Sequence, residues 1–218
     1  MATTYQVISA GESRSFPTDH RFLEQQDFYG MARVFVGKDA GKAFAAAGDL
    51  VARPFVAIEL GTECLGQHTG EKKGQEGSNV VGFARFRMGS AEPSSLIELV
   101  RQPQTQASAV AAAKAAFEEA GFKVAVCGDF PGRIVDRLIR PYLNAALRRL
   151  DERLASADDM DKTLCLGLGY PEGPISLLER TGLAAHHDVS QALYVALGQD
   201  AYTPARRAQV AKARASQD

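Results

Sequence analysis

The sequence has little that marks a specialised class of protein. Its 218 residues include 25 basic and 26 acidic side chains, a net charge of −1 that does not indicate nucleic-acid or anionic-membrane binding. The three cysteines, at positions 64, 127 and 165, form no C-x-x-C pair and are typical of reduced thiols in a cytoplasmic protein. Apolar stretches such as residues 54–60 are too short to span a bilayer, and the first residues, MATTYQ, do not resemble a secretory signal.

The N-terminal part of the sequence contains a series of short apolar runs. The sequence predicts strands over residues 32–37, 54–60 and 80–88, and a helix over 39–50 that Asp39 could cap. The segments 10–20 and 61–79, rich in glycine and charge, are expected to be loops. The order strand, helix, strand, loop, strand is typical of an α/β unit.

The same alternation continues for one more round. Residues 95–101 and 123–127 are predicted strands, and the alanine-rich segment 106–120 between them is a predicted helix. Thr105 is the expected N-terminal cap of this helix, and Gly121 is expected to end it.

From residue 128 onward the pattern is helical throughout. A long amphipathic helix is predicted over 133–154, with a kink or break at Pro141. Ser156 is the expected cap of a helix over 157–166, which Gly167 and Gly169 should end, and further helices are predicted over 175–180, 183–197 and the basic tail after 205. We therefore expect an α/β domain over residues 1–127 and a helical domain over 128–218.

Two sequence blocks in the helical half resemble one enzyme family. The string that begins at Asp129, DFPGRIVDRLIRPYLNAA, resembles the pattern D-x-P-G-F-I-V-N-R-L-x-x-P-Y-x-N-E-A. The strings SADDMD, from Ser156, and GLGYPEGP, from Gly167, resemble S-x-E-D-I-D and G-L-G-Y-P-M-G-P. Both blocks are typical of 3-hydroxyacyl-CoA dehydrogenases, and their order and spacing agree with that family.

The resemblance implies a fold, a partner and a cofactor. It implies a truncated, degenerate Rossmann-like α/β domain that would bind NAD, followed by a helical domain that pairs two copies as a homodimer. It also implies an acyl-CoA-type ligand. The cofactor side departs from the family, because the one glycine-containing turn after a predicted strand, which begins at Gly37, lacks the fingerprint spacing of a dinucleotide site. The NAD-binding residues are therefore left unassigned.

The catalytic side departs from the family as well. In the family a histidine, oriented by a glutamate, accepts the hydroxyl proton while hydride leaves for NAD. The histidine motif resembles V-x-G-x-H-F-F-N-P, and its histidine position falls on Ala84 in the segment VVGFARFRM. The resemblance places the glutamate at Glu98 and the asparagine of the second block at Asp136. It places the substrate loop near Thr62.

Several other residues have two interpretations. Arg133, Arg137 and Arg140 give the long helix a basic face, which is either solvated or a contact for CoA phosphates. The adjacent His186 and His187 point in different directions on a helix, so a surface pair is favoured over a metal site. Cys64 and His68 have a ligand-like spacing without a second pair, so we expect no metal.

Three functional hypotheses follow. The first is a pseudoenzyme or acyl-CoA-binding subunit without dehydrogenase chemistry, because Ala84 cannot accept a proton. The second is an active NAD-dependent dehydrogenase with a relocated base, because Glu98 is retained. The third is a structural dimerisation partner of a full-length dehydrogenase. No membrane or nucleic-acid partner is expected.

Overall fold

The computed structural model describes residues 3–71 and 79–217. Contacts within the chain divide it into two compact units. The first, the sheet unit, comprises Met1–Arg87 and Pro93–Ile134, and the second, the helical unit, comprises Met88–Glu92 and Val135–Asp218. Within the described parts of the chain, no helix combines the length and the apolar character that a membrane crossing needs.

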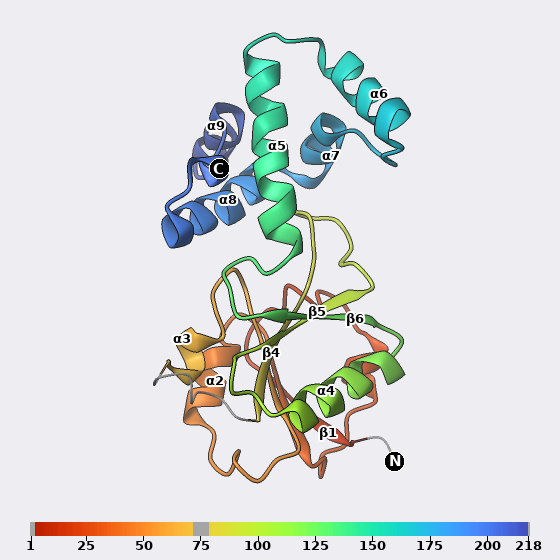
Figure 1. The fold of residues 1–218 in the computed structure, drawn as a ribbon, viewed down its shortest axis with the longest axis vertical. Helices are drawn as coiled ribbons and strands as arrows, with labels where there is room; N and C mark the ends of the chain where they lie inside the picture. Colours follow the sequence, from red (N-terminus) through yellow and green to blue (C-terminus); the bar gives the residue numbers. More distant parts are fainter. Residues whose placement is uncertain (1–2, 72–78, 218) are drawn as a thin grey trace. The chain divides into compact units, whose positions relative to one another are not determined.

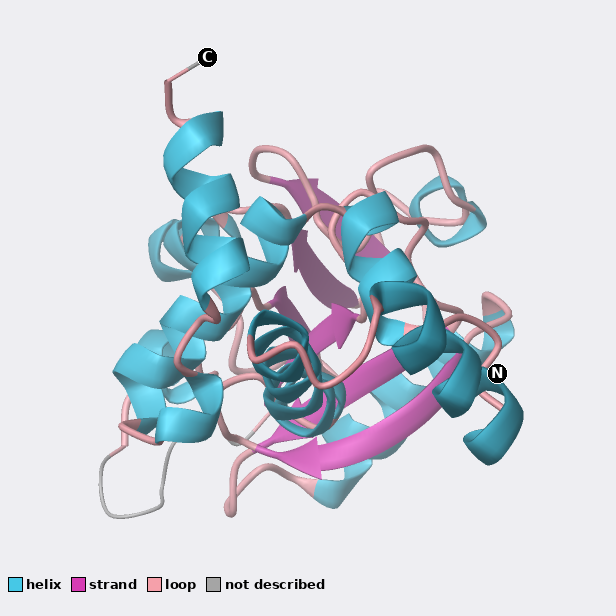
Figure 2. Ribbon diagram, turned by 90° about the horizontal axis from the view of Figure 1, so that it is seen from above, coloured by secondary structure: helices cyan, strands magenta, loops and turns pink. Residues whose placement is uncertain are grey.

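The sheet unit is built on one six-stranded sheet (Figure 1). Its elements are β1 (Tyr5–Ser9), α1 (Arg21–Glu24), β2 (Ala32–Val36), α2 (Ala40–Ala46), β3 (Val56–Glu59), α3 (Gly66–Thr69), β4 (Val80–Arg85), β5 (Leu96–Arg101), α4 (Ala107–Glu119) and β6 (Lys123–Gly128). Strands β1 to β4 are parallel, β5 runs antiparallel to β4, and β6 is parallel to β5. Figure 2 shows the strands turning relative to one another across the sheet, the usual twist.

Both faces of the sheet are buried, which explains why its strands are continuous apolar runs. Successive side chains of a strand point to opposite faces. In β2, Val34 joins the core on the α4 side while Phe35 joins the core on the α2 side. In β4, Val81 and Phe83 face α4, and Val80 faces α2. This alternation also fixes the face of the polar residues that follow.

The edge strand β1 was not predicted from the sequence, and the chain covers it with its own loop. Gln26 accepts the Val7 N–H through Oε1 at 3.0 Å, and the Asp27 N–H donates to the Tyr5 carbonyl at 2.8 Å. Gly30 lies so close to β1 that a Cβ there would be 2.4 Å from the Tyr5 backbone. Side-chain and backbone groups of this loop thus occupy edge groups that could otherwise pair with another strand.

The helical unit contains five α-helices in its described residues (Figure 1). They are α5 (Val135–Asp151), α6 (Ala157–Leu168), α7 (Pro174–Thr181), α8 (Leu183–Leu197) and α9 (Arg206–Ala215), with a short 3-10 helix at Asp200–Tyr202. The expected cap is confirmed, since Ser156 Oγ accepts the Asp159 N–H at 3.1 Å. Pro141 lies inside α5, and the helix continues past it without the predicted break.

A short segment ahead of the long helix belongs to the helical unit. The Ser90 N–H donates to the Thr181 carbonyl at 3.0 Å. Gly89 has φ +52° and lies directly on this carbonyl, where a Cβ would collide with the oxygen. Glycine is therefore required at this close approach between segment 88–92 and the end of α7.

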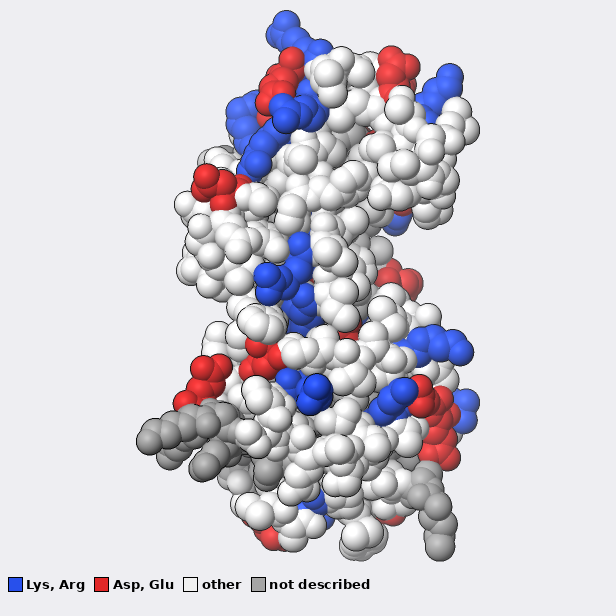
Figure 3. All heavy atoms as spheres, in the orientation of Figure 1, with Lys and Arg blue, Asp and Glu red and all other residues white. Residues whose placement is uncertain are grey.

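Charged side chains of both signs are mixed at one end of the helical unit. Asp151 pairs with Arg206 at 3.0 Å and Arg207 at 2.8 Å, which joins the end of α5 to α9. Figure 3 shows acidic and basic atoms intermixed near these two helices, whereas most of the visible surface over α7 and α8 is uncharged. The exposed pairs contribute little stability individually.

Further local predictions were wrong. The Asp39 side chain does not cap α2 and pairs instead with Lys42 at 2.7 Å. Thr105 does not cap α4; its hydroxyl instead accepts the Gln102 N–H at 2.9 Å. The expected loop 61–79 contains the short helix α3, and its part 72–78 lies outside the described residues. Gly167 lies within α6, which ends at Gly169 in the left-handed conformation. The other predicted strands and helices lie where the sequence placed them, most with shifted ends, whereas β1, α1 and the 3-10 helix were not predicted.

Candidate functional site

The sheet places Ala84 directly opposite Glu98. The two residues are Cα partners in the antiparallel ladder of β4 and β5, and both side chains are buried. The alternation along each strand directs both toward the α2 side of the sheet. A side chain at position 84 that was long enough to carry a base would therefore meet the Glu98 carboxylate, and the methyl group of Ala84 cannot.

The Glu98 carboxylate is held by the turn that follows β6. Oε1 accepts the Ile134 N–H at 2.8 Å, and Oε2 lies 3.6 Å from Nε of Arg133. Both charged side chains are only 3% exposed, so this is a buried ion pair. Such a pair contributes little net stability, but losing one member leaves an uncompensated charge.

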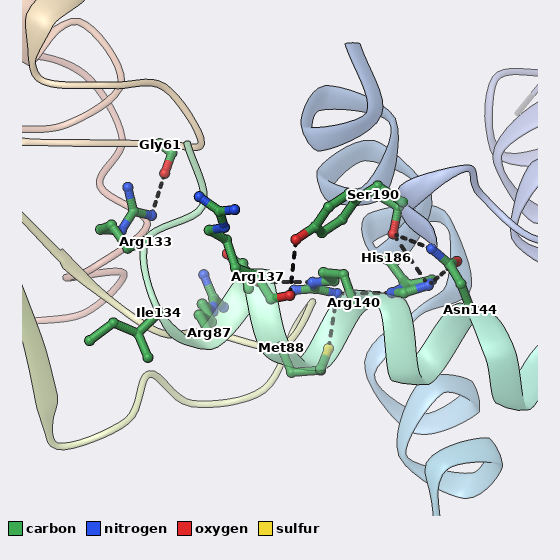
Figure 4. Close-up of polar contacts among 12 residues, drawn as sticks. Gly61, Arg87, Met88, Arg133, Ile134, Arg137, Arg140, Asn144, His186 and Ser190 are labelled. Atoms are coloured by element: carbon green, nitrogen blue, oxygen red, sulfur yellow. Dashed lines mark hydrogen bonds and ion pairs between the residues drawn. The ribbon is translucent and has the colours of Figure 1, made fainter. Parts of the chain in front are cut away.

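Arg133 reaches this position through an unusual backbone. Gly132 and Arg133 both have positive φ, +71° and +53°, and Arg133 precedes α5 rather than lying on it. Its Nη2 donates to the Gly61 carbonyl at 2.5 Å. The predicted basic helical face therefore does not include Arg133, whose guanidinium is buried in the sheet unit (Figure 4).

The same turn is fastened to the loop that carries Thr62. The Gly132 N–H donates to the Thr62 carbonyl at 3.0 Å. The Asp129 carboxylate accepts the N–H groups of Leu65 and Gly66, each at 2.7 Å. Three of the sequence-predicted site residues, Thr62, Glu98 and Arg133, are thus brought to one region of the sheet unit.

The thiols in this region are not poised as nucleophiles. Burial, reinforced by the negative charge of Asp129, raises the pKa of Cys64 to about 11. Burial, reinforced by the charge of Glu98, likewise raises the pKa of Cys127 to about 11. Because the thiolate is the reactive form, both cysteines stay protonated and unreactive near neutral pH.

The other two predicted site residues lie in the helical unit. Asp136, in the first turn of α5, is buried and pairs with Arg140 at 2.8 Å. Arg137 is half-buried, and its carbonyl accepts the Tyr202 hydroxyl at 3.1 Å. The structure therefore places Asp136 in a buried ion pair.

His186 is buried, so the predicted surface pair of histidines was wrong for this member. Nη1 of Arg140 lies 3.0 Å from Nδ1 of His186 and 3.2 Å from the sulfur of Met88 (Figure 4). Because the guanidinium can only donate, Nδ1 is the acceptor and the proton of the neutral ring sits on Nε2. Nε2 then donates to Oδ1 of Asn144 at 3.0 Å. His187, by contrast, lies 3.1 Å from Asp188 at the surface.

The pH dependence of stability should report this histidine. Burial, and then the positive charge of Arg140, lower the pKa of His186 to about 3 from its ordinary 6.5. Below pH 6.5 the imidazole of the unfolded chain binds a proton, whereas the buried ring of the folded protein stays neutral. The free energy of unfolding therefore falls as the pH drops from 6.5 toward 3. We expect a loss of up to about 1.4 kcal/mol per pH unit in chemical unfolding, and a clearly flatter profile for His186→Gln. Identical profiles for both proteins would contradict this assignment.

The residues at the strand ends do not fit a dinucleotide. In this fold class the pyrophosphate binds beyond the carboxyl ends of parallel strands, where strand order reverses. Here each strand from β1 to β6 neighbours the next one in sequence, without reversal. The Gly37 N–H donates at 2.6 Å to the Glu59 carboxylate, a residue the sequence analysis did not single out.

The ligand-like spacing of Cys64 and His68 has a different structural basis. Nε2 of His68 lies 3.5 Å from Oε1 of Glu63, and its ring packs against Gly41 of α2, where any Cβ would collide with it. Over residues 3–71 and 79–217, no three histidine, cysteine or acidic side chains are grouped as a metal ion would need.

The sequence matches known proteins mainly through its helical part. Residues 132–217 match the family model described as 3-hydroxyacyl-CoA dehydrogenase, C-terminal domain. A probable 3-hydroxybutyryl-CoA dehydrogenase of Deinococcus radiodurans is 31% identical over 109 residues, 50% of this chain and 39% of that protein. The mitochondrial hydroxyacyl-coenzyme A dehydrogenase of Sus scrofa is 39% identical over 88 residues, 40% of this chain and 28% of that protein. The chain thus matches well under half the length of these relatives.

Solved structures extend the likeness to most of the chain at the level of fold. The (S)-3-hydroxybutyryl-CoA dehydrogenase of Ralstonia eutropha superposes with a TM-score of 0.70 at 22% identity, covering 85% of this chain and 66% of that one. The 3-hydroxybutyryl-CoA dehydrogenase of Escherichia coli K12 also gives 0.70 at 22% identity, covering 86% and 42%. The predicted Rossmann-like sheet followed by a helical domain is confirmed. The likeness of the chain to 3-hydroxyacyl-CoA dehydrogenases thus lies in the sequence of its C-terminal helical domain and in the fold of both units.

Proposed function

We propose that the chain binds an acyl-CoA-type ligand without dehydrogenase chemistry, as a pseudoenzyme or binding subunit of acyl-CoA metabolism. The observation that carries this proposal is the pairing of Ala84 with Glu98 across the β4–β5 ladder. The family resemblance puts the proton acceptor at position 84, and a methyl group has no lone pair to accept a proton. A cytoplasmic location fits the three free thiols.

The groups around Glu98 support the same conclusion. Oxidation of a 3-hydroxyacyl group needs a base with a pKa near the working pH. Arg133 lies beside the carboxylate, and a guanidinium stays protonated in proteins, so it cannot take the role of the imidazole. It forms a buried ion pair with Glu98 instead.

The ligand class follows from the family and from the donors at hand. The relatives named above are dehydrogenases of hydroxyacyl or hydroxybutyryl thioesters of coenzyme A. In the sheet unit we assign Thr62 to substrate binding, with the buried Arg133 holding the turn beside it. In the helical unit, taken by itself, Arg137 is the residue that we assign to a ligand contact. Guanidinium groups suit the phosphates of a CoA molecule, since they bind phosphate oxygens in bidentate fashion.

A thermal-shift comparison of acetoacetyl-CoA, CoA and NAD tests this proposal. A ligand that binds the folded state at about 100 times its Kd raises the melting temperature, here by about 5 °C or more. We expect that shift with acetoacetyl-CoA and none with NAD at millimolar concentration. Arg137→Met should reduce the shift, whereas Arg149→Met, on an exposed pair of the same helix, should not. A shift with NAD alone would refute the proposal.

The alternative of an active dehydrogenase with a relocated base finds less support. Among the described contacts, His20 accepts the Phe22 N–H, His68 lies against Glu63, and His186 lies against Arg140. Each of these imidazoles has a structural contact of its own. A calorimetric titration that shows saturable NAD binding would revive this alternative.

The helical unit favours a second candidate role, pairing with another dehydrogenase-type chain. The family match covers this unit, and several of its large apolar side chains are exposed. They are Leu138, Leu154, Leu166, Leu168, Val195 and Val210. Exposed apolar side chains suit a protein interface where they gather into one patch. Sedimentation of the purified chain should show a homodimer; a monomer that assembles only with a full-length dehydrogenase would favour the purely structural role.

A further inference from the structure

A buried carboxylate, that of Glu59, connects the carboxyl ends of β2 and β3 to the segment that follows β1. Glu59 is the last residue of β3, and Gly37 directly follows β2. Oε2 of Glu59 accepts the Gly37 N–H at 2.6 Å, and Oε1 accepts the Ser15 N–H at 2.7 Å. The Ser13 hydroxyl lies 2.8 and 2.9 Å from the two oxygens and donates to the carboxylate. Glu59 is 6% exposed.

The segment after β1 is fastened across these strand ends. Its backbone joins the turn after β2, where the Lys38 N–H donates to the Glu12 carbonyl and the Asp39 N–H to the Ala10 carbonyl, both at 2.9 Å. Gly37 has φ +110°, and a Cβ there would lie 2.5 Å from the Ala10 and Gly11 carbonyl oxygens. Only glycine permits this close approach, so the turn after β2 can pack directly against the segment that follows β1.

The same segment reaches the fourth parallel strand. Arg85, at the end of β4, donates through Nη1 to the Ser15 carbonyl at 2.8 Å. Its guanidinium also lies over the rings of Phe16 and Phe122, 5.4 and 5.0 Å from their centroids. Residues 10–16 therefore lie across the edge of the sheet at which parallel-sheet folds bind their ligands.

The partners of Glu59 are those that a bound anion would have. The described contacts of its carboxylate are two backbone N–H groups and one hydroxyl, all neutral donors. Backbone N–H groups at the end of a strand, one of them from a glycine turn, are the donors that hold a pyrophosphate in dinucleotide-binding folds. A buried carboxylate needs such partners, because its charge is otherwise costly to remove from water.

We propose that Glu59 is an internal anion that takes the place of a bound phosphate at this edge of the sheet. The Glu59 carboxylate satisfies the donors that a phosphate would otherwise bind, so the sheet unit folds without a dinucleotide. The corollary is that removing the carboxylate opens a site for a small external carboxylate. This inference does not depend on whether the chain binds acyl-CoA.

Chemical rescue of Glu59→Ala tests the proposal. The substitution deletes the atoms of an acetate ion and leaves three donors unsatisfied, so we expect the melting temperature to fall by about 8 °C or more. Sodium acetate or formate, compared with sodium chloride at equal ionic strength, should restore about 4 °C or more of that loss. The wild-type protein should show no difference between these salts. Adding Ser13→Ala to Glu59→Ala should weaken the rescue.

A second measurement decides the case if Glu59→Ala does not fold. Amide hydrogen exchange of the wild-type protein should show strong protection at Gly37 and Ser15, although both lie outside the strands, and Glu59→Gln should lose at least ten-fold of it. Glu118→Ala, on an exposed helical pair, is the matched control and should change nothing. Unprotected amides in the wild type, a Glu59→Ala protein as stable as wild type, or a foldable Glu59→Ala protein without acetate rescue would each overturn the proposal. Loss of acyl-CoA binding alone would not overturn this proposal.

Discussion

Replacing Arg140 by methionine is expected to lower the free energy of unfolding of the helical unit by about 3 to 5 kcal/mol. Arg140 is fully buried and pairs with Asp136 at 2.8 Å. Methionine fills similar volume but leaves the Asp136 carboxylate buried without this cation. The same change removes the hydrogen bond to Nδ1 of His186, so two buried polar groups each lose a hydrogen bond at once.

Urea unfolding followed by the helical circular dichroism signal measures this loss. The matched control is Arg149→Met, whose arginine forms an exposed pair with Glu152 on the same helix. That variant should cost at most about 1 kcal/mol. A double variant, Asp136→Leu with Arg140→Met, should recover much of the stability, because it removes the uncompensated charge. An Arg140→Met protein as stable as the control would show that the ion pair contributes nothing.

The second large effect is expected at the pair formed by Glu98 and Arg133. Arg133→Met should cost about 3 kcal/mol or more, since it removes the cation that lies beside the buried Glu98 carboxylate. Glu98→Leu should cost a similar amount, because it leaves the Arg133 guanidinium buried without the Glu98 carboxylate. The double variant should be more stable than either single variant, with a coupling energy of about 2 to 3 kcal/mol.

A double-mutant cycle by chemical unfolding gives this coupling directly. The exposed pair of Lys114 and Glu118 on α4 is the control cycle and should give about 0.5 kcal/mol or less. Additive effects of Arg133→Met and Glu98→Leu would mean that the two charges do not support each other. Glu98 would then be available for another role, and the proposed loss of dehydrogenase chemistry would lose one of its supports.

Much of the helical unit could be predicted from the sequence because its signals are local. The helix Leu183–Leu197 has the predicted bounds, and Ser156 caps α6 as expected. Helical spacing of apolar residues and a capping hydroxyl act within one or two turns of chain. The buried strands β2, β3 and β5 were also found, since a sheet covered on both faces requires continuous apolar runs.

The features that were missed depend on contacts between distant residues. The strand β1 is only partly buried, so its sequence is not a continuous apolar run. His186 was assigned to the surface because its neighbours did not show that Arg140 and Asn144, both on α5, would face it. Glu59 had one local signal, a carboxylate at the end of the apolar run FVAIEL, which implies a buried partner. Its donors, at positions 13, 15 and 37, lie 22 to 46 residues away in sequence.

We propose that this scaffold, which is similar to that of 3-hydroxyacyl-CoA dehydrogenases, lacks the proton acceptor of their reaction. The most direct test is a turnover assay with acetoacetyl-CoA and NADH at catalytic concentrations of the purified chain. We predict no NADH consumption above the rate without protein, while acetoacetyl-CoA still raises the melting temperature. Steady NADH consumption over many turnovers, retained after the preparation is purified to homogeneity, would contradict the claim.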